Sequence, residues 1–255
     1  MSKDKSTVLA FMITRADTDA RRTLLNDTIA EMYETAKYPF DLIVYVNTND
    51  LQTVDLIETM APEYGFTYRL FMENTGQHIP TNDAIKVADE GGYDYLLRVD
   101  DDVKFMTKGW LDKLVKVADK IGPDFIISPL IRGLLNPPPQ TDTVEVRGVK
   151  LRFLERAIGG ICRLHSVDAL CDPEYPYTAD VRLPMGFGDA TGIGEWCREA
   201  VEKKGMKRWM VYVEQVRVKH RLGTSKQRDE DMVYHNSHGM FQTIPYIPVW
   251  VGEGE

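Results

Sequence analysis

The fold of this chain is decided by one stretch of sequence, Tyr93-Asp94-Tyr95-Leu96-Leu97-Arg98-Val99-Asp100-Asp101-Asp102. Its apolar and aromatic residues predict a short buried strand, and the strand ends in three adjacent carboxylates that cannot share that burial. Sheets of α/β proteins place their ligands at the carboxyl ends of strands, where a divalent cation with oxygen ligands would neutralise these charges. The alternative is a solvated acidic turn, and the flanking sequence decides between the two.

The composition is that of a globular protein with one sizeable core. The chain has 255 residues, of which 43% are hydrophobic and 27% are charged, so a disordered chain is excluded. Its 31 basic and 39 acidic side chains give a net charge of −8, which repels nucleic acid unless a local basic groove is present. We therefore expect a single domain over residues 1–255.

Cysteine usage and the length of the apolar segments bear on the cellular setting. Cys162, Cys171 and Cys197 are odd in number and form no Cys-x-x-Cys pair, which favours reduced thiols and argues against a zinc site. The sequence begins with polar residues, and no apolar segment approaches the ~18 residues of a membrane span. We therefore expect a cytoplasmic protein without a transmembrane segment, and these features do not predict its oligomeric state.

Strands alternate with helices through the first half of the chain. The expected strands are 7–14, 42–46 and 66–71, and the expected helices are 17–36, 54–60 and 79–90. This alternation predicts a mostly parallel sheet in which the loops at the strand ends hold the polar side chains. The polar residues that follow these strands include Thr14, Arg15, Asn47, Asn49 and Asn74. Each of them also suits a simple turn.

The second half has a less regular pattern. We expect a helix from Lys108-Gly109-Trp110, a strand at 124–128, an exposed loop at 136–139 and an edge or hairpin strand at 144–154. A small-residue strand at 157–162, a glycine-rich loop at 185–195, a helix that starts at Glu195 and a strand at 216–219 are expected to follow. A tail from residue 221 to residue 255 is expected to fold across the body.

Five short motifs follow one another around the opening stretch. They are Asn74-Thr75-Gly76, Asn82-Asp83-Ala84, Gly91-Gly92-Tyr93-Asp94-Tyr95, Val99-Asp100-Asp101-Asp102 and Gly109-Trp110-Leu111. In this order and spacing they resemble the motif series of GT-A fold glycosyltransferases, and in particular the large family 2 of nucleotide-sugar-dependent enzymes. The resemblance extends more loosely through Glu195-Trp196-Cys197-Arg198 to His220, so it covers roughly residues 7 to 220. The chain departs from the family at Lys108, where proline is usual, and lacks its Glu-Asp pair at 188–195.

The resemblance implies an α/β, Rossmann-like GT-A fold, with a mostly parallel sheet flanked by helices and a smaller antiparallel part on the acceptor side. The nucleotide-sugar half would span about 7–102 and the acceptor half 103–220, with the tail folded over the site. The implied enzyme is a metal-dependent hexosyltransferase that uses Mn²⁺ or Mg²⁺. It would move a sugar from a nucleoside-diphosphate sugar, expected to be a UDP-sugar, to an acceptor hydroxyl with inversion. The acceptor stays open among a saccharide, a protein and a modified base in DNA.

The resemblance also assigns site residues. The expected metal ligands are Asp100, Asp102 and His220. In an extended Asp-x-Asp segment the first and third side chains project to one side, so Asp101 is expected to have a supporting role. The residues expected to contact the donor are Thr14, Arg15, Asn47, Asn49, Asn74, Asp100, Asp101, Arg221 and Lys226. His220 could also be purely structural.

The catalytic base is left open between two carboxylates. An inverting displacement needs one carboxylate close to the acceptor hydroxyl, and the 185–195 loop offers Asp189 and Glu195. Asp189 is expected in a flexible loop, whereas Glu195 is expected in the first turn of a helix, whose dipole favours its charged form. A retaining mechanism would need neither residue.

Two other function classes compete with the transferase. A nucleotidyltransferase has a similar sheet and acidic metal site, but the first strand here leads into Met12-Ile13-Thr14-Arg15-Ala16-Asp17 and not into a glycine-rich loop. A non-catalytic binding domain with the same fold is the other alternative. The intact Asp100-Asp101-Asp102, the downstream acidic loop and His220 favour an enzyme over such a binding domain.

Overall fold

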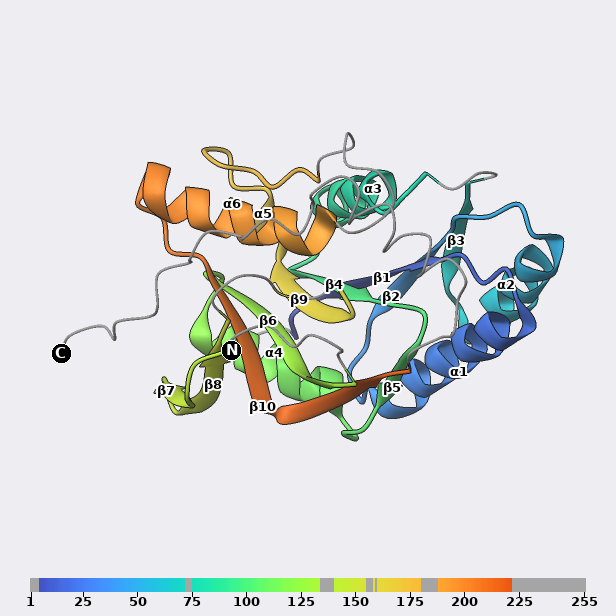
Figure 1. Cartoon of the computed structure of the whole chain (residues 1–255), viewed down its shortest axis with the longest axis horizontal. Helices are drawn as coiled ribbons and strands as arrows, with labels where there is room; N and C mark the ends of the chain where they lie inside the picture. The colour runs from blue at the N-terminus through green and yellow to red at the C-terminus, as the bar shows by residue number, and fades with distance from the viewer. Residues whose placement is uncertain are drawn as a thin grey trace, which may run out of the picture.

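The computed structural model describes residues 5–71, 75–133, 140–154, 158, 160–179 and 188–221, with side chains from residue 192 onward in the last range. A ten-stranded sheet runs through this part of the chain (Figure 1). The expected loop at 136–139 and the expected tail beyond Arg221 lie outside the described residues.

The first half is a regular strand and helix alternation. Its elements are β1 (Val8–Thr14), α1 (Asp19–Thr35), β2 (Asp41–Val46), α2 (Leu51–Tyr64), β3 (Thr67–Leu70), α3 (His78–Glu90) and β4 (Tyr95–Val99). The four strands pair in parallel, which confirms the predicted parallel sheet. Helix α2 starts earlier than the predicted residue 54 because the Asp50 side chain accepts a hydrogen bond from the backbone N–H of Thr53 and caps it.

The second half builds the antiparallel part. Its elements are β5 (Val103–Phe105), α4 (Trp110–Ile121), β6 (Phe125–Arg132), β7 (Val144–Val146), β8 (Val149–Phe153), β9 (Cys162–Ser166), α5 (Val167–Leu170), α6 (Gly188–Lys204) and β10 (Trp209–His220). Strand β9 is antiparallel to β4 and β6, and β10 is antiparallel to β5 and β8 but parallel to β6. The edge or hairpin strand expected at 144–154 is a hairpin of β7 and β8, with β7 at the edge of the sheet. The order of the strands across the sheet is β3-β2-β1-β4-β9-β6-β10-β8-β7, with β5 paired to β10.

Two expectations for the second half are wrong. The strand expected at 157–162 begins only at Cys162, because Gly160 and Ile161 form the turn before it. The helix expected to start at Glu195 starts earlier, at Gly188. The buried stripe of α6 includes Ile193 as well as Trp196, Cys197 and Ala200, at helical spacing, so the apolar face extends upstream of Glu195.

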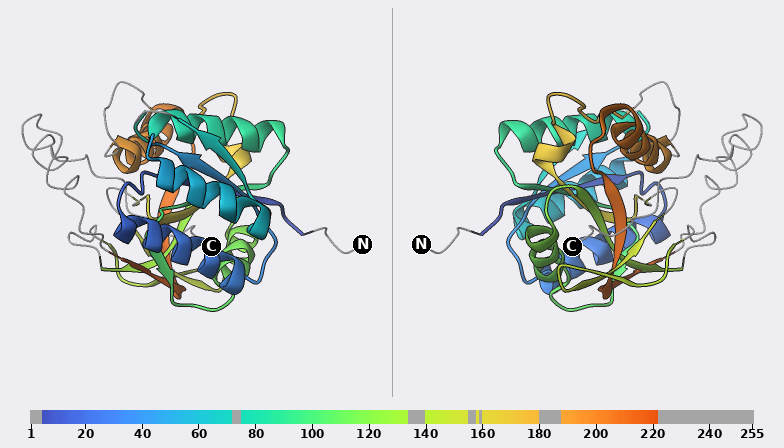
Figure 2. Two further views of the ribbon diagram at one scale, coloured as in Figure 1. Left: turned by 90° about the vertical axis from the view of Figure 1, so that its right-hand side faces the viewer. Right: turned by 90° about the vertical axis from the view of Figure 1, so that its left-hand side faces the viewer.

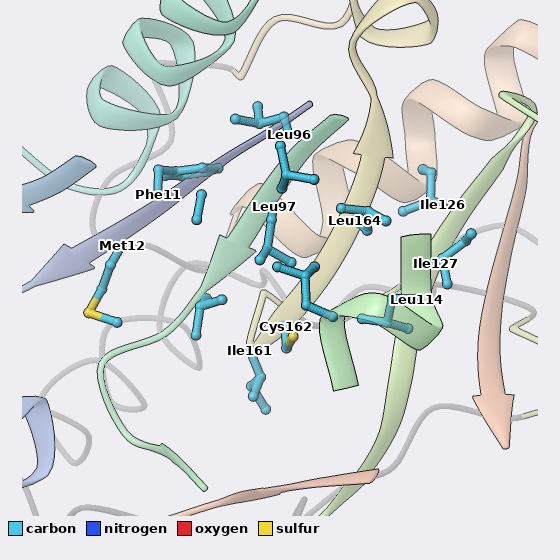
Figure 3. Close-up of a cluster of buried hydrophobic side chains, with 14 of the residues drawn as sticks. Phe11, Met12, Leu96, Leu97, Leu114, Ile126, Ile127, Ile161, Cys162 and Leu164 are labelled. Atoms are coloured by element: carbon cyan, nitrogen blue, oxygen red, sulfur yellow. The ribbon is translucent and has the colours of Figure 1, made fainter. Parts of the chain in front are cut away.

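Helices cover both faces of the sheet. In the two side views, α3 and α6 lie above the sheet and α1 and α4 lie below it (Figure 2). The core lies between these layers, where side chains of β1, β4, β6 and β9 meet α4 (Figure 3). Buried Leu97, Leu114 and Leu164 belong to this cluster. Packing of this kind fixes where the strands end and therefore where the polar loops lie.

Cys162 and Cys197 are buried and Cys171 is partly buried, and all three are free thiols, as predicted. None of the helices in the described part combines the length and apolar character that crossing a lipid bilayer requires.

Candidate active site

The segment Asp100–Asp102, here named the carboxylate turn, follows β4 and is held by three distant parts of the chain. The backbone N–H of Asp100 donates to the carbonyl oxygen of Ile161 at 2.9 Å, and the N–H of Arg221 donates to the carbonyl of Asp102 at 2.8 Å. The Thr28 hydroxyl of α1 lies 3.1 Å from the Asp101 carbonyl oxygen. These contacts give the turn one defined shape before any ligand is present.

Asp101 is buried and has two strong partners of its own. Its Oδ2 accepts a hydrogen bond from the Thr14 hydroxyl at 2.6 Å, and its Oδ1 lies 2.6 Å from Nη2 of Arg21. Burial raises the pKa of Asp101 to about 6, against the opposing effect of the Arg21 charge. This side chain therefore ties β1 and α1 to the turn.

Arg21 was missed by the sequence analysis. It lies in the first turn of α1, after the Thr18 cap, and its guanidinium spans two carboxylates of the turn. Nη2 contacts Asp101, and Nη1 lies 3.2 Å from Oδ2 of Asp102. Its position in the sequence could have identified it, because a cation in the first helical turn after β1 lies at the same edge of the sheet as the end of β4.

Asp102 and His220 form the centre of the site. Oδ1 of Asp102 is buried, has no well-formed hydrogen bond within the described residues, and lies 3.1 Å from Nε2 of His220. The pairing of β5 with β10 sets this distance, because His220 is directly opposite Val103. Burial lowers the pKa of His220, but contact with Asp102 outweighs it and the net shift is upward.

Asp100 does not join this pair. Its Oδ1 lies 3.3 Å from Nη2 of Arg98, a buried cation that also donates to Oε1 of Gln77 at 2.5 Å. A Cβ atom at Gly160 would lie 2.8 Å from Cζ of Arg98, so this space is open to Arg98 only because residue 160 is glycine. Arg98 and Gly160 thus set the direction of Asp100.

The predicted metal set of Asp100, Asp102 and His220 is therefore only partly brought together. Within the described residues, no group of three or more His, Cys, Asp or Glu side chains is arranged to hold a metal ion. The Asp102 and His220 pair does fit one. Octahedral ions with bonds of about 2.1 Å place neighbouring ligands about 3 Å apart, close to the 3.1 Å observed between Oδ1 and Nε2.

Several residues expected to contact the donor are engaged within the protein. Thr14 donates to Asp101, as described above. The Asn47 side chain donates to the Gly76 carbonyl at 2.8 Å and accepts from the Thr75 N–H at 2.8 Å, so it joins the loop after β2 to the start of α3. Both residues lie at this edge of the sheet, and their hydrogen bonds stabilise the loops there.

The other donor contacts expected after β1, β2 and β3 have different surroundings. Nε of Arg15 lies 3.6 Å from Oδ2 of Asp17, and both side chains are substantially exposed. Asn49 is exposed. Asn74 lies outside the described residues. Arg15 and Asn49 are therefore accessible to a ligand at the sheet edge.

Arg221 does not offer the free positive charge that was expected of it. Its Nη1 lies 2.9 Å from Oδ2 of Asp27, and Nη2 pairs with Glu31, both on α1. These carboxylates neutralise the guanidinium and fasten the end of β10 to α1. Lys226 lies outside the described residues.

The two candidate bases have different positions from those expected. Glu195 is exposed and lies in the interior of α6, so the argument from the helix dipole no longer applies to it. Asp189 falls within the range of α6 and not in a loop, and its side chain lies outside the described part.

The site can now be compared with known proteins. The model of the glycosyl transferase family 2 matches residues 20–154, which is more than half of the chain and includes the carboxylate turn. The chain belongs to glycosyl transferase family 2. The family predicted from the five motifs is thereby confirmed. Comparison with curated proteins found no sequence match.

Solved structures agree with the fold of this family 2 chain. Mannosyltransferase PcManGT from Pyrobaculum calidifontis, in complex with GDP-Man and Mn²⁺, aligns with a TM-score of 0.57 at 12% identity over 94% of this chain and 66% of its own. GalNAc-T7 with UDP, GalNAc and Mn²⁺ has a TM-score of 0.57 at 12% identity, over 86% of this chain and 44% of its own. S. aureus TarS 1-349 in complex with UDP has a TM-score of 0.54 at 14% identity, over 85% and 61%. The chain thus spans only about half to two thirds of these proteins, and the likeness shows the predicted GT-A fold.

Proposed function

We propose that this family 2 chain transfers a sugar from a nucleoside-diphosphate sugar to an acceptor hydroxyl, with Mn²⁺ or Mg²⁺ held by Asp102 and His220. The single observation that supports this most directly is the buried Oδ1 of Asp102, which lacks a well-formed hydrogen bond among the described residues and lies 3.1 Å from Nε2 of His220. A divalent cation between this carboxylate oxygen and the imidazole nitrogen would neutralise a negative charge that burial makes costly.

Known structures of the same fold support the choice of ligands. PcManGT has been solved with GDP-Man and Mn²⁺, GalNAc-T7 with UDP and Mn²⁺, and TarS 1-349 with UDP. For this chain we propose a UDP-sugar as donor, placed at the edge formed by the ends of β1, β2 and β4. Arg15 and Asn49 would border the nucleotide there, because they are accessible and follow these strands.

Each residue of the carboxylate turn would have a different role in the transfer. A bound cation would neutralise charge on the departing diphosphate. Arg21 holds Oδ2 of Asp102, which leaves Oδ1 directed toward His220. Asp100 is held by Arg98 and is partly exposed, so it is placed to contact the ribose or a cation-bound water. Asp101 keeps the turn in place and touches no ligand in this scheme.

For the base we propose Asp189 first and Glu195 second, in an inverting transfer. A base variant should bind the donor normally yet lose transfer by a factor on the order of 10²–10⁴. Asp189→Asn and Glu195→Gln therefore make a direct comparison once an acceptor is known. If both variants transfer at the wild-type rate, the proposal for this segment is wrong.

The test of the proposed function uses the donor alone. The whole chain is incubated with a panel of UDP-sugars and GDP-sugars, with Mn²⁺ or with excess chelator, and release of the nucleoside diphosphate is measured. We expect slow hydrolysis of one donor that depends on Mn²⁺. Hydrolysis of none would contradict the proposal and favour a binding domain, and consumption of a nucleoside triphosphate together with a sugar phosphate would favour a nucleotidyltransferase.

A further inference from the structure

Four exposed cations lie side by side on one face of β5, β10 and β6. Lys219 is directly opposite Lys104 of β5 on one side and Arg132 of β6 on the other, so the three side chains form a row across neighbouring strands. Arg217 lies two residues before Lys219 and therefore projects to the same face. We name these four residues the cationic face.

The arrangement is unfavourable for the protein alone. Like charges directly opposite each other on neighbouring strands destabilise a sheet. Within the described residues none of the four forms an ion pair. Some exposed cations elsewhere in the described part are paired with acids, for example Lys86 with Glu90 and Lys116 with Asp112, whereas others, such as Lys37 and Lys204, are not. The cationic face differs because its four cations are neighbours, and such a cluster in a protein with a net charge of −8 favours binding of an anion.

A hollow borders both the cationic face and His220. It has a volume of about 490 Å³ and is lined by Leu24, Lys104, Gly133, Lys219, His220 and Arg221. A Cβ atom at Gly133 would lie 2.9 Å from the His220 carbonyl oxygen, and the residue has a φ of +86°, so a side chain there is excluded. The hollow therefore has the two lysines and the end of β10, with His220, in the same lining.

We propose that the cationic face binds phosphate groups of the acceptor, and that this acceptor is a phosphate-bearing saccharide without nucleobases. The inference rests on the proposed function, because it names the substrate that completes the transfer. The three cations of the row span only about 10 Å, since neighbouring strands lie ~4.8 Å apart. This compact size suits one or two phosphate groups and is short for the extended backbone track of a nucleic acid.

Two further observations favour this occupant. Among the described residues, the large hydrophobic side chains that are exposed are Leu51, Leu70, Ile79 and Met106, and none of them is aromatic. A single-stranded nucleic acid is normally bound by aromatic side chains that stack on its bases. Met106 is the one member of this set beside the cationic face, which is little apolar surface for docking to a lipid bilayer.

The test measures binding of sodium tripolyphosphate by calorimetry in excess chelator, so that a cation at Asp102 cannot contribute. The double variant Lys104→Gln/Lys219→Gln is compared with Lys86→Gln/Lys116→Gln, which removes the same charge from exposed helix positions. We expect the first variant to lose at least about tenfold in affinity and the second to match the wild type. Equal affinity of the first variant and the wild type, or equal loss in both variants, would overturn the inference.

The same variants are used to compare tripolyphosphate with other anionic ligands. Citrate tests carboxylates, a deoxythymidine decamer tests nucleic acid, and vesicles of phosphatidylglycerol and phosphatidylcholine test a membrane. The assignment of the ligand would be overturned if one of these probes bound more tightly than tripolyphosphate and lost affinity only in Lys104→Gln/Lys219→Gln. Wild-type hydrolysis of sugar nucleotides is measured in parallel. If sugar nucleotides are hydrolysed but tripolyphosphate binding does not depend on Lys104 and Lys219, this inference alone is contradicted. If tripolyphosphate binding depends on these lysines but no sugar nucleotide is hydrolysed, the proposed function is contradicted.

Discussion

The carboxylate turn directly precedes β5 and the cationic face lies on β5, β10 and β6, yet charge is compensated differently in the two regions. In the turn, Asp101 and Asp102 are buried against Arg21, and Asp100 lies against Arg98. On the cationic face, Lys219 stands between two further cations with no acid of the described residues paired to it. Charge that is compensated inside the protein maintains structure, whereas charge that is left uncompensated on a surface is available to a ligand.

The largest effect is expected at Asp102, whose Oδ1 faces His220. Asp102→Asn keeps the shape of the side chain and removes its charge, so Mn²⁺-dependent donor hydrolysis should fall by a factor on the order of 10³, because a bound cation contributes several kcal/mol of charge stabilisation. Initial rates at saturating Mn²⁺ measure this. Asp55→Asn, at an exposed site of α2, is the control and should retain the wild-type rate. Full activity of Asp102→Asn in excess chelator would contradict the metal role.

Removal of the compensating cation should unfold the turn and not only weaken binding. Arg21→Met leaves two buried carboxylates without their partner, so we expect the free energy of unfolding to fall by about 3 kcal/mol. Urea denaturation measures this loss. Arg22→Met is the matched control, because Arg22 pairs with Asp19 and Asp50 and touches no residue of the turn. If both variants lose stability equally, Arg21 has no special role.

The buried carboxyl of Asp101 predicts a pH dependence with a definite sign. Burial raises its pKa from 3.8 to about 6, so the folded state binds the proton more tightly than the unfolded chain. The stabilising contribution is therefore complete below about pH 4 and is lost as the pH rises through 6. Relative to Asp101→Asn, the wild type should lose on the order of 2 kcal/mol of unfolding free energy between pH 4 and pH 7. A constant difference across this range would show that the pKa is not raised.

The smallest effect is expected on the cationic face, and it has the opposite sign. Lys219→Gln relieves repulsion with both Lys104 and Arg132, so the protein should become more stable by about 0.2–1 kcal/mol. The difference should shrink at high salt, because added ions screen exposed charges. Lys116→Gln breaks a pair with Asp112 and should not stabilise the protein. A loss of stability in Lys219→Gln would mean that its charge is compensated after all.

The sequence predicted the first half well because its signals are local. Each strand from β1 to β4 is followed or preceded by its own helix, and parallel pairing then follows from the order of elements. The carboxylates Asp100 to Asp102 could be identified for the same reason, since they directly follow a buried apolar strand. Family membership agrees with the motifs read from this region.

The remaining strand pairings and site residues depend on contacts between residues far apart in the chain. Strand β10 lies between β6 and β8 and also pairs with β5, and no local pattern in residues 209–220 indicates these partners. That pairing is what brings His220 to Asp102. Arg21 lies 80 residues from Asp101, and Gly160 shapes the site only through contact with Arg98. Such residues can be found only once the sheet order is known.

One measurement tests the central claim most directly, namely that Asp102 and His220 hold a divalent cation. Mn²⁺ binding is followed by electron paramagnetic resonance in the presence of UDP, for the wild type, Asp102→Asn and His220→Gln, with Asp55→Asn as the control. We predict one tight ion in the wild type and the control, and affinity at least about tenfold weaker in each site variant. Equal Mn²⁺ affinity in all four proteins would contradict the account.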